Sequence, residues 1–125
     1  ILAHPAIASR LRLNGRDPDR VTVDVERPWA RIDARGVQQG FIDRVEFERD
    51  ADGAVGRVRI IDWKTDHLAE AASEAEVREH LDRYAPQIQA YREVMAAATG
   101  LDPAAIEAVL AFTGSGRIVP VPPGA

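Results

Sequence analysis

Cysteine is absent from this 125-residue chain, which therefore cannot build a disulfide, a zinc–thiolate site or an iron–sulfur cluster. The sequence also lacks any run of about 18 apolar residues, so we expect no membrane-spanning helix. Ile1-Leu2-Ala3-His4 shows neither the charged start nor the apolar run of a signal peptide. These absences predict a cytoplasmic protein, which agrees with a reducing compartment.

An excess of positive charge is also lacking. The chain holds 16 Lys and Arg against 20 Asp and Glu, which gives a net charge of −4 and a pI near 5.3. This balance argues against a domain that holds nucleic acid by a general basic surface. Arg44, Arg57 and Arg59 remain available for local phosphate contacts, although the ordinary place of such arginines is a solvated sheet face.

The length and the hydrophobic content of 46% predict one domain over residues 1–125 with a single core. Residues 5–13 have the pattern of a short helix. Alternating valines over residues 21–25 predict a first strand, and the turn at residues 34–36 leads into a second strand. These two strands are expected to pair antiparallel.

The most informative part of the sequence is a pair of apolar runs that each carry a carboxylate. Gly40–Val45 contains Asp43, and Ile60–Thr65 contains Asp62. Asp52-Gly53 lies between them and predicts a tight hairpin that pairs the two runs antiparallel. A hairpin centred on this dipeptide sets Asp43 directly opposite Asp62.

Because side chains alternate along a strand, both acids are expected at the edge of one buried face. The residues expected on this face are Phe41, Asp43, Val45 and Phe47 on one strand, and Val58, Ile60, Asp62 and Lys64 on the other.

Facing carboxylates, with Cβ atoms about 5 Å apart, destabilise a sheet, and burying them without partners costs several kcal/mol more. A bound divalent cation removes the conflict, and oxygen ligands of this kind suit Mg²⁺ or Mn²⁺. Lys64 follows Asp62 by about 7 Å along the same side of the strand and can point its ammonium group into the site. Two acids and a lysine indicate phosphodiester hydrolysis.

The same residues also have an ordinary structural interpretation. Asp43 and Asp62 would then be strand-end acids neutralised by Arg44 or Lys64, as in any domain with 29% charged residues. A bulge in the hairpin would shift the register by one residue and turn one acid to the other face. The pattern alone leaves both interpretations open.

A helix is expected after these strands, because the hydrophobic period changes there. Ser73 and Glu76 form a capping box at its start, and Gly100 gives a stop signal. Pro86 is expected to break or restart the helix. The expected apolar stripe consists of Val77, Leu81, Tyr84, Ile88, Tyr91, Val94, Met95 and Ala98.

Two further short strands are expected at residues 108–113 and 117–121, around a glycine-rich turn. The order of elements predicts a mixed α/β or α+β layer in which the helix covers the apolar face of the sheet.

Three segments resemble known sequence motifs. Gly40–Val45, Ile61–Thr65 and Gln87–Tyr91 are similar to the G-x-I-D-R, D-x-K-T and Q-x-x-x-Y motifs of the RecB-like branch of the PD-(D/E)XK nucleases, in the same order. Val25–Trp29 resembles the E-x-P-aromatic strand before the first motif, and Ala108–Thr113 the strand after the helix. The resemblance implies a restriction-endonuclease-like core, an antiparallel three-strand meander plus a helix and further strands.

The resemblance also implies roles for individual residues. Asp43, Asp62 and the main-chain carbonyl of Trp63 would bind Mg²⁺, for which Mn²⁺ can substitute. Lys64 would be the catalytic lysine, which positions the attacking water and counters charge on the phosphate oxygens.

Three further residues have two possible roles each. Gln87 and Tyr91 stand four apart on one helix face and would brace the site or touch the DNA backbone, with plain helix packing as the alternative. Glu26 is either an acid at the rim of the site or a solvated strand residue, and we favour the second.

One feature of the family is missing from the sequence. These nucleases carry a metal-binding histidine in a G-x-x-H setting on an upstream helix, and His4 does not match that motif. We therefore expect a fragment that lacks this helix, which puts the activity of the isolated chain in question. His67 and His80 are expected at a loop and at an exposed helix position.

The absence of cysteine favours the AddA or RecB type over relatives that carry a four-cysteine iron–sulfur cluster. The implied function is a Mg²⁺-dependent exonuclease module of an ATP-dependent helicase–nuclease, acting on double-stranded DNA ends and single strands in double-strand-break repair and recombination. Helicase motor domains in the same polypeptide, and a second helicase–nuclease subunit, would be its partners. A catalytically inactive module that binds DNA ends or a partner is the alternative.

Overall fold

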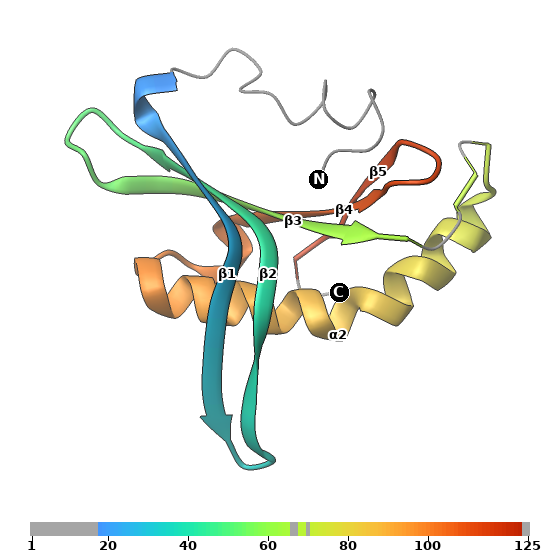
Figure 1. Cartoon of the computed structure of the whole chain (residues 1–125), viewed down its shortest axis with the longest axis horizontal. Coiled ribbons are helices and arrows are strands. Elements are labelled where there is room, and N and C mark those ends of the chain that lie inside the picture. Colours follow the sequence, from blue (N-terminus) through green and yellow to red (C-terminus); the bar gives the residue numbers. More distant parts are fainter. Residues whose placement is uncertain (1–17, 66–67, 70, 124–125) are drawn as a thin grey trace.

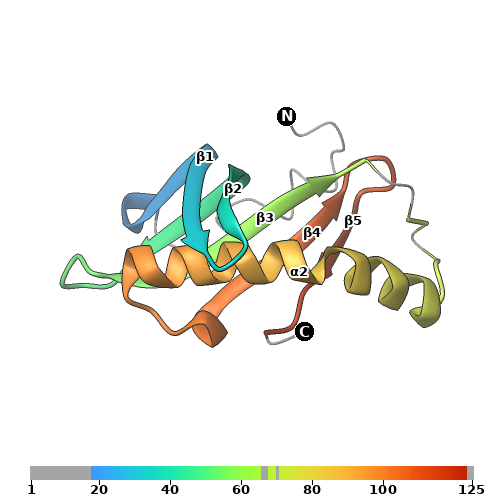
Figure 2. The same ribbon diagram turned by 90° about the horizontal axis from the view of Figure 1, so that it is seen from below.

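The computed structural model describes residues 18–65, 68–69 and 71–123. A five-stranded sheet lies against one long helix, α2 (Glu74–Thr99), as Figures 1 and 2 show. The strands follow the sheet order and are β1 (Val21–Asp33), β2 (Gly36–Arg49), β3 (Val55–Lys64), β4 (Ile106–Phe112) and β5 (Arg117–Pro120). Two short 3₁₀ turns, η1 (Pro18–Arg20) and η2 (Pro103–Ala105), precede β1 and β4. The helix expected at residues 5–13 lies outside the described residues.

The connections confirm the predicted mixed α/β fold. Strands β1, β2 and β3 form an antiparallel meander, and β4 pairs parallel to β3. A parallel neighbour requires a crossover connection, which α2 supplies. Strand β5 returns antiparallel to β4. No helix in the described part of the chain is long and apolar enough to cross a membrane.

The predicted register of the β2–β3 hairpin is confirmed. Arg44 pairs with Ile61 and Glu48 with Arg57, and the register shifts only at Glu48/Arg49, beside the turn. One residue beyond the Arg44–Ile61 pair, the same register sets Asp43 across from Asp62. The bulge therefore lies too far from the acids to turn either one to the other face.

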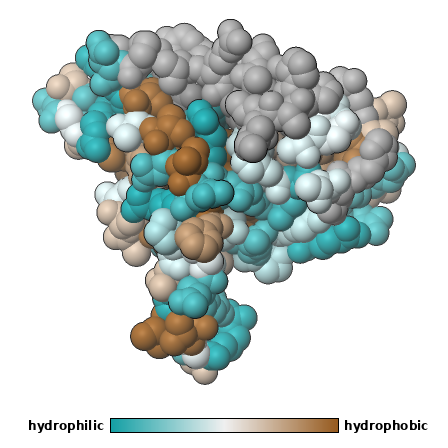
Figure 3. All heavy atoms as spheres, viewed as in Figure 1, coloured by the Kyte–Doolittle hydropathy of each residue, from teal (hydrophilic) through white to brown (hydrophobic). Residues whose placement is uncertain are grey.

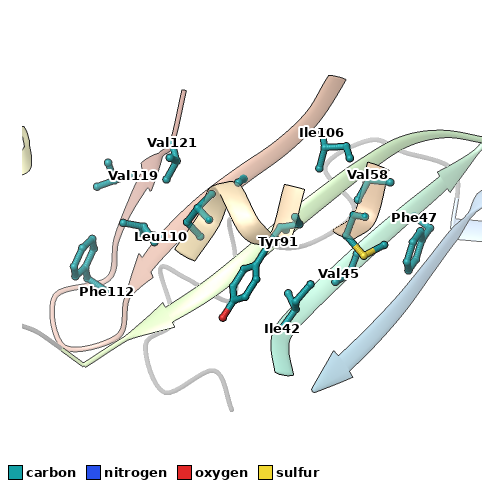
Figure 4. Packing of buried hydrophobic residues seen from close by; sticks show 14 of the residues in the cluster. Ile42, Val45, Phe47, Val58, Tyr91, Ile106, Leu110, Phe112, Val119 and Val121 are labelled. Atoms are coloured by element: carbon teal, nitrogen blue, oxygen red, sulfur yellow. The ribbon is translucent and has the colours of Figure 1, made fainter. Parts of the chain in front are cut away.

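The main core lies between the sheet and α2. It contains residues from β2, β3 and β4, together with Val119 of β5 and Val121. Ile88, Tyr91 and Met95 of the helix are buried against them. Figure 4 shows these side chains packed together, with the hydroxyl group of Tyr91 pointing out of the apolar cluster. The core thus ends at the edge where β2 and β3 carry their acids.

The prediction that Phe41 shares the buried face was wrong. Phe41 is 64% exposed, whereas its neighbour Ile42 is fully buried in the main core. The physical reason is an irregularity in β1, where Glu26 has a φ of 49° and is skipped between two regular pairs of the β1–β2 ladder. This backbone conformation is unusual for a residue with a side chain, and it interrupts the alternation at Asp43. Beyond it the β1–β2 hairpin bends and projects past α2 (Figure 1).

The expected helix break at Pro86 was also wrong. Helix α2 begins after its N-cap Ser73 and runs through Pro86 to the C-cap Gly100, whose φ is 80°. A proline inside a helix costs about 3 kcal/mol, because it removes one hydrogen bond and crowds the preceding turn. Apolar side chains before and after Pro86 pack on the same core, so burial of both halves offsets this cost.

Two other expectations about side chains need correction. His80 is half-buried rather than exposed, because its ring meets the ring of Phe112 edge-on at 5.5 Å. Arg44 and Arg59 do not lie on a solvated face, because they pair with the buried Glu46 at 3.1 Å and 2.8 Å. Of the arginines considered for phosphate contacts, only Arg57 is exposed, and it pairs with Glu107.

Arg92 of α2 was not foreseen as part of the core. Its side chain is 2% exposed and donates hydrogen bonds to the main-chain carbonyls of Ile106, Val121 and Pro122. Burial lowers the pKa of Arg92 below its ordinary value. The guanidinium group therefore joins α2 to the start of β4 and to the chain after β5.

Candidate active site

The two acids meet where the β2–β3 ladder ends. Asp62 is 3% exposed, and its carboxyl group lies within hydrogen-bonding reach of that of Asp43. Asp43 Oδ2 also accepts a 2.8 Å hydrogen bond from the main-chain amide of Trp63. Both acids are thereby held side by side at the rim of the core.

Burial and mutual proximity change the protonation of this pair. Burial raises the pKa of Asp62 to about 6, the neighbouring Asp43 adds to the rise, and Lys64 opposes it. The pKa of Tyr91 rises to about 12, first through burial and then through the charges of Asp62 and Asp43. Both shifts have the sign expected for groups that face negative charge in a partly desolvated site.

Lys64, the last residue of β3, points its ammonium group into the same site. Its Nζ lies 2.8 Å from Asp62 Oδ2 and donates a 3.0 Å hydrogen bond to Oε1 of Gln87 on α2. The same nitrogen lies 4.0 Å from the centre of the Tyr84 ring, which is cation–π geometry. A carboxylate, an amide oxygen and an aromatic ring therefore hold one ammonium group in place.

Tyr84 is the residue near the site that sequence reasoning missed. It was expected only as part of the apolar stripe of the helix. Its position three residues before Gln87, hence one turn away on the same helix face, was the available signal. The spacing predicts a contact between Tyr84 and Lys64 only once it is known that the end of β3 lies against this turn of α2.

Tyr91 connects the site to the projecting hairpin. Its hydroxyl group lies 3.5 Å from the main-chain carbonyl of Phe41, and its ring meets Trp29 edge-on at 5.8 Å. Trp29 in turn covers Gly40, where an added Cβ would lie 3.3 Å from Nε1 of the indole. Helix α2 and the hairpin are thus in contact through two aromatic side chains.

The structure brings together five of the side chains predicted for the site: Asp43, Asp62, Lys64, Gln87 and Tyr91. Glu26 lies at the irregular position of β1, and its side chain is exposed.

The carbonyl of Trp63 points toward the same side as these acids. Successive residues of a strand direct their backbone groups to opposite neighbours. The carbonyl of Lys64 accepts a hydrogen bond from Thr113, next to β4, at 3.0 Å. The amide and carbonyl of Trp63 therefore face β2, which agrees with the hydrogen bond from its amide to Asp43.

These donors suit a hard divalent cation. Oδ2 of Asp62 is buried, and among the described residues no donor meets hydrogen-bond geometry at this oxygen, so its contact with Lys64 is an ion pair. Two carboxylates and a carbonyl are the oxygen ligands that Mg²⁺ and Mn²⁺ prefer. Within the described part of the chain no group of three or more His, Cys, Asp or Glu side chains is arranged to hold a metal. Water and substrate oxygens would have to complete the ligand sphere.

Comparison with known proteins assigns the family. No curated protein matches the chain significantly. The family model of the PD-(D/E)XK nucleases, phosphodiester hydrolases that generally use divalent metals such as Mg²⁺, matches residues 3–121. Its restriction-endonuclease-like fold agrees with the mixed sheet and the single covering helix of this structure. The chain therefore belongs to the PD-(D/E)XK nuclease superfamily.

Proposed function

We propose that this chain is a metal-dependent deoxyribonuclease module. Asp43, Asp62 and the Trp63 carbonyl would hold Mg²⁺, and Lys64 would be the catalytic lysine. The observation that carries the proposal is the fixed ammonium group of Lys64 beside two adjoining carboxyl groups, one of them buried. A fold gains nothing in stability from facing acids, whereas metal-dependent hydrolysis needs them.

Each residue contributes a separate part of the chemistry. When bound, the metal polarises the phosphate and lowers the pKa of the attacking water. Lys64 orients this water and counters the negative charge that develops on the phosphate oxygens. Gln87 and Tyr84 hold the lysine in place, since they contact its Nζ from α2. Asp62 acts in its ionised form, which predominates only above about pH 6 because burial raises its pKa.

The biological setting is proposed from the sequence motifs and the charge. The three motifs resemble those of the RecB-like branch, and the absence of cysteine favours its AddA or RecB type. A net charge of −4 suits a module that receives DNA from a helicase motor in the same polypeptide. We therefore propose exonucleolytic processing of double-stranded DNA ends and single strands in double-strand-break repair and recombination, in the cytoplasm. A second helicase–nuclease subunit would be a partner.

A second candidate function is DNA-end or partner binding without cleavage. The observation that favours it is that the described residues supply only two acidic metal ligands. Against it stands the cost of keeping Asp62 buried beside Asp43, which a binding module does not require.

Cleavage of end-labelled DNA in Mg²⁺ separates the two candidates. We expect Asp62→Asn and Lys64→Ala to lose about 100-fold or more of the wild-type rate of nucleotide release. Arg78→Ala is the matched control, because Arg78 is an exposed cation on the solvent side of α2. Cleavage by Asp62→Asn at the wild-type rate would refute the nuclease assignment.

A further inference from the structure

A hollow lies on the projecting β1–β2 hairpin. It has a volume of about 630 Å³, within the range of small-molecule sites. Its lining residues are Pro28, Trp29, Ala30, Gln39, Gly40 and Phe41. Phe41 is the more exposed of its two aromatic side chains, with 64% of its surface exposed.

The hollow adjoins the candidate active site. Phe41 precedes Asp43 by two residues, which is about 7 Å along a strand. The carbonyl of Phe41 also contacts the hydroxyl of Tyr91, one of the side chains of the candidate active site. The main chain at Phe41 therefore lies close to the two acids, and its exposed side chain lines the first hollow.

A second hollow flanks the same part of the hairpin on the side of α2. It has a volume of about 570 Å³ and shares Trp29 and Gln39 with the first hollow. It also includes Gln87, the partner of Lys64, together with Arg31 and Arg35. The side chain of Arg35 is 76% exposed and pairs with Asp33 at 3.5 Å, and Arg31 pairs with Glu93 of α2 at 3.2 Å. The second hollow therefore extends from Gln87, which contacts the catalytic lysine, to two arginines.

The two hollows together match the two chemical parts of a nucleotide chain. An exposed aromatic ring beside an amide suits a base, which stacks on aromatic groups and hydrogen-bonds to amides. Arginines and a glutamine suit the phosphates that follow it. We propose that Phe41 is the stacking platform for one base of a single-stranded substrate, whose phosphate backbone runs along Arg35 toward Lys64. This inference rests on the proposed nuclease function and adds a binding subsite to it.

The surface of the hairpin favours a nucleic acid over an apolar protein partner at this place. The most exposed aliphatic side chains of the hairpin, Ile32 and Val37, flank its turn, where Figure 3 shows hydrophobic atoms among hydrophilic ones. Phe41 lies away from that end, beside Gln39 and the acids. A ring beside an amide and a phosphate site is the arrangement that a base requires.

Binding of a fluorescein-labelled 12-nucleotide poly-dT strand, followed by anisotropy in EDTA, tests the inference with the whole chain. We expect Phe41→Ala to weaken binding between about 5-fold and 150-fold, which corresponds to the loss of one stacked base. Phe41→Tyr should restore it to within about twofold, because the ring is kept. Ile32→Ala is the matched control, because Ile32 is an exposed apolar residue of the same hairpin that lines neither hollow, and it should bind as the wild type does.

The salt dependence distinguishes stacking from a charge effect. Phe41→Ala should leave the slope of log Kd against log salt unchanged, whereas Arg35→Ala should reduce it by about 0.7. Equal affinities of Phe41→Ala and Ile32→Ala would overturn the inference. An equal loss of affinity for duplex DNA would also overturn it, as would a Phe41-dependent dimer in sedimentation, which would make a second copy the occupant. Because EDTA removes any metal, this result is independent of whether the chain cleaves DNA.

Discussion

The main-chain amide of Trp63 donates a 2.8 Å hydrogen bond to Oδ2 of Asp43. This bond replaces a ladder hydrogen bond at the point where β2 bends away from β3. It fixes the Asp43 carboxylate beside Asp62 and gives the amide a partner that it would otherwise lack. The Asp43 side chain therefore satisfies a backbone amide at the end of the β2–β3 ladder and also supplies an acid to the site.

Substitutions of Asp43 should separate these two roles. Asp43→Asn keeps an oxygen acceptor, so we expect the free energy of unfolding to change by less than about 1 kcal/mol. Asp43→Ala leaves the Trp63 amide without its partner and should cost about 1–3 kcal/mol. Urea unfolding in EDTA measures both values. An equal loss in the two variants would show that the hydrogen bond does not stabilise the hairpin.

The pKa of Asp62 predicts how the stability of the metal-free protein depends on pH. Its folded value of about 6 lies above the ordinary 3.8, so the folded state binds this proton more tightly than the unfolded state. The stabilising contribution is complete below about pH 3.8 and is lost as the pH rises through about 6.

Asp62→Asn cannot ionise and avoids this loss. We expect it to be more stable than the wild type by about 2–3 kcal/mol at pH 8, and by roughly half as much at pH 5. Urea unfolding in EDTA at both pH values tests this, with the exposed Asp82→Asn as the control. A variant that is less stable than the wild type at pH 8 would contradict the stated cause of the pKa shift.

Tyr84 should act on cleavage through Lys64. Tyr84→Leu removes the ring that lies 4.0 Å from Nζ and should slow cleavage by about 3- to 30-fold, since a cation–π contact contributes about 0.5–2 kcal/mol. Tyr84→Phe keeps the ring and should retain the wild-type rate. In a Lys64→Ala background, Tyr84→Leu should have no further effect. Equal slowing in both backgrounds would show that Tyr84 does not position the lysine.

Arg92→Met should destabilise the fold by about 2–4 kcal/mol. Three buried or partly buried carbonyl groups lose a charged donor, and little of this loss is recovered by the apolar side chain. Arg78→Met, at an exposed position of the same helix, should change stability by less than about 0.5 kcal/mol. Similar unfolding midpoints for the two variants would refute the role of Arg92 in the core.

The sequence was most informative where local signals agreed. Asp52-Gly53 and the alternation of β3 both predicted the hairpin register, and the structure confirms it. The capping box is also confirmed, since Ser73 Oγ accepts a 3.2 Å hydrogen bond from the amide of Glu76. The positions of Asp43 and Asp62 next to each other follow from that register. Their roles as metal ligands stay predictions.

Prediction failed where tertiary structure overrides a local rule. The backbone at Glu26 interrupts the strand alternation, and Phe41 is exposed as a result. Nothing in the amino-acid sequence around Glu26 predicts this irregularity. Pro86 is accepted inside α2 because packing on both sides outweighs its local cost. Arg92 resembles any polar helix residue until the positions of the carbonyl groups that it binds, at the start of β4 and after β5, are known.

Calorimetric titration of the chain with Mn²⁺ tests the central claim most directly, because it requires the metal site and no complete nuclease reaction. We predict one site per chain at pH 8, lost in both Asp43→Asn and Asp62→Asn and retained in the control Asp82→Asn. Affinity should fall as the pH is lowered through about 6, because protonation of Asp62 competes with the metal. Binding that persists in both variants, or no binding by the wild-type chain, would contradict the two-carboxylate metal site.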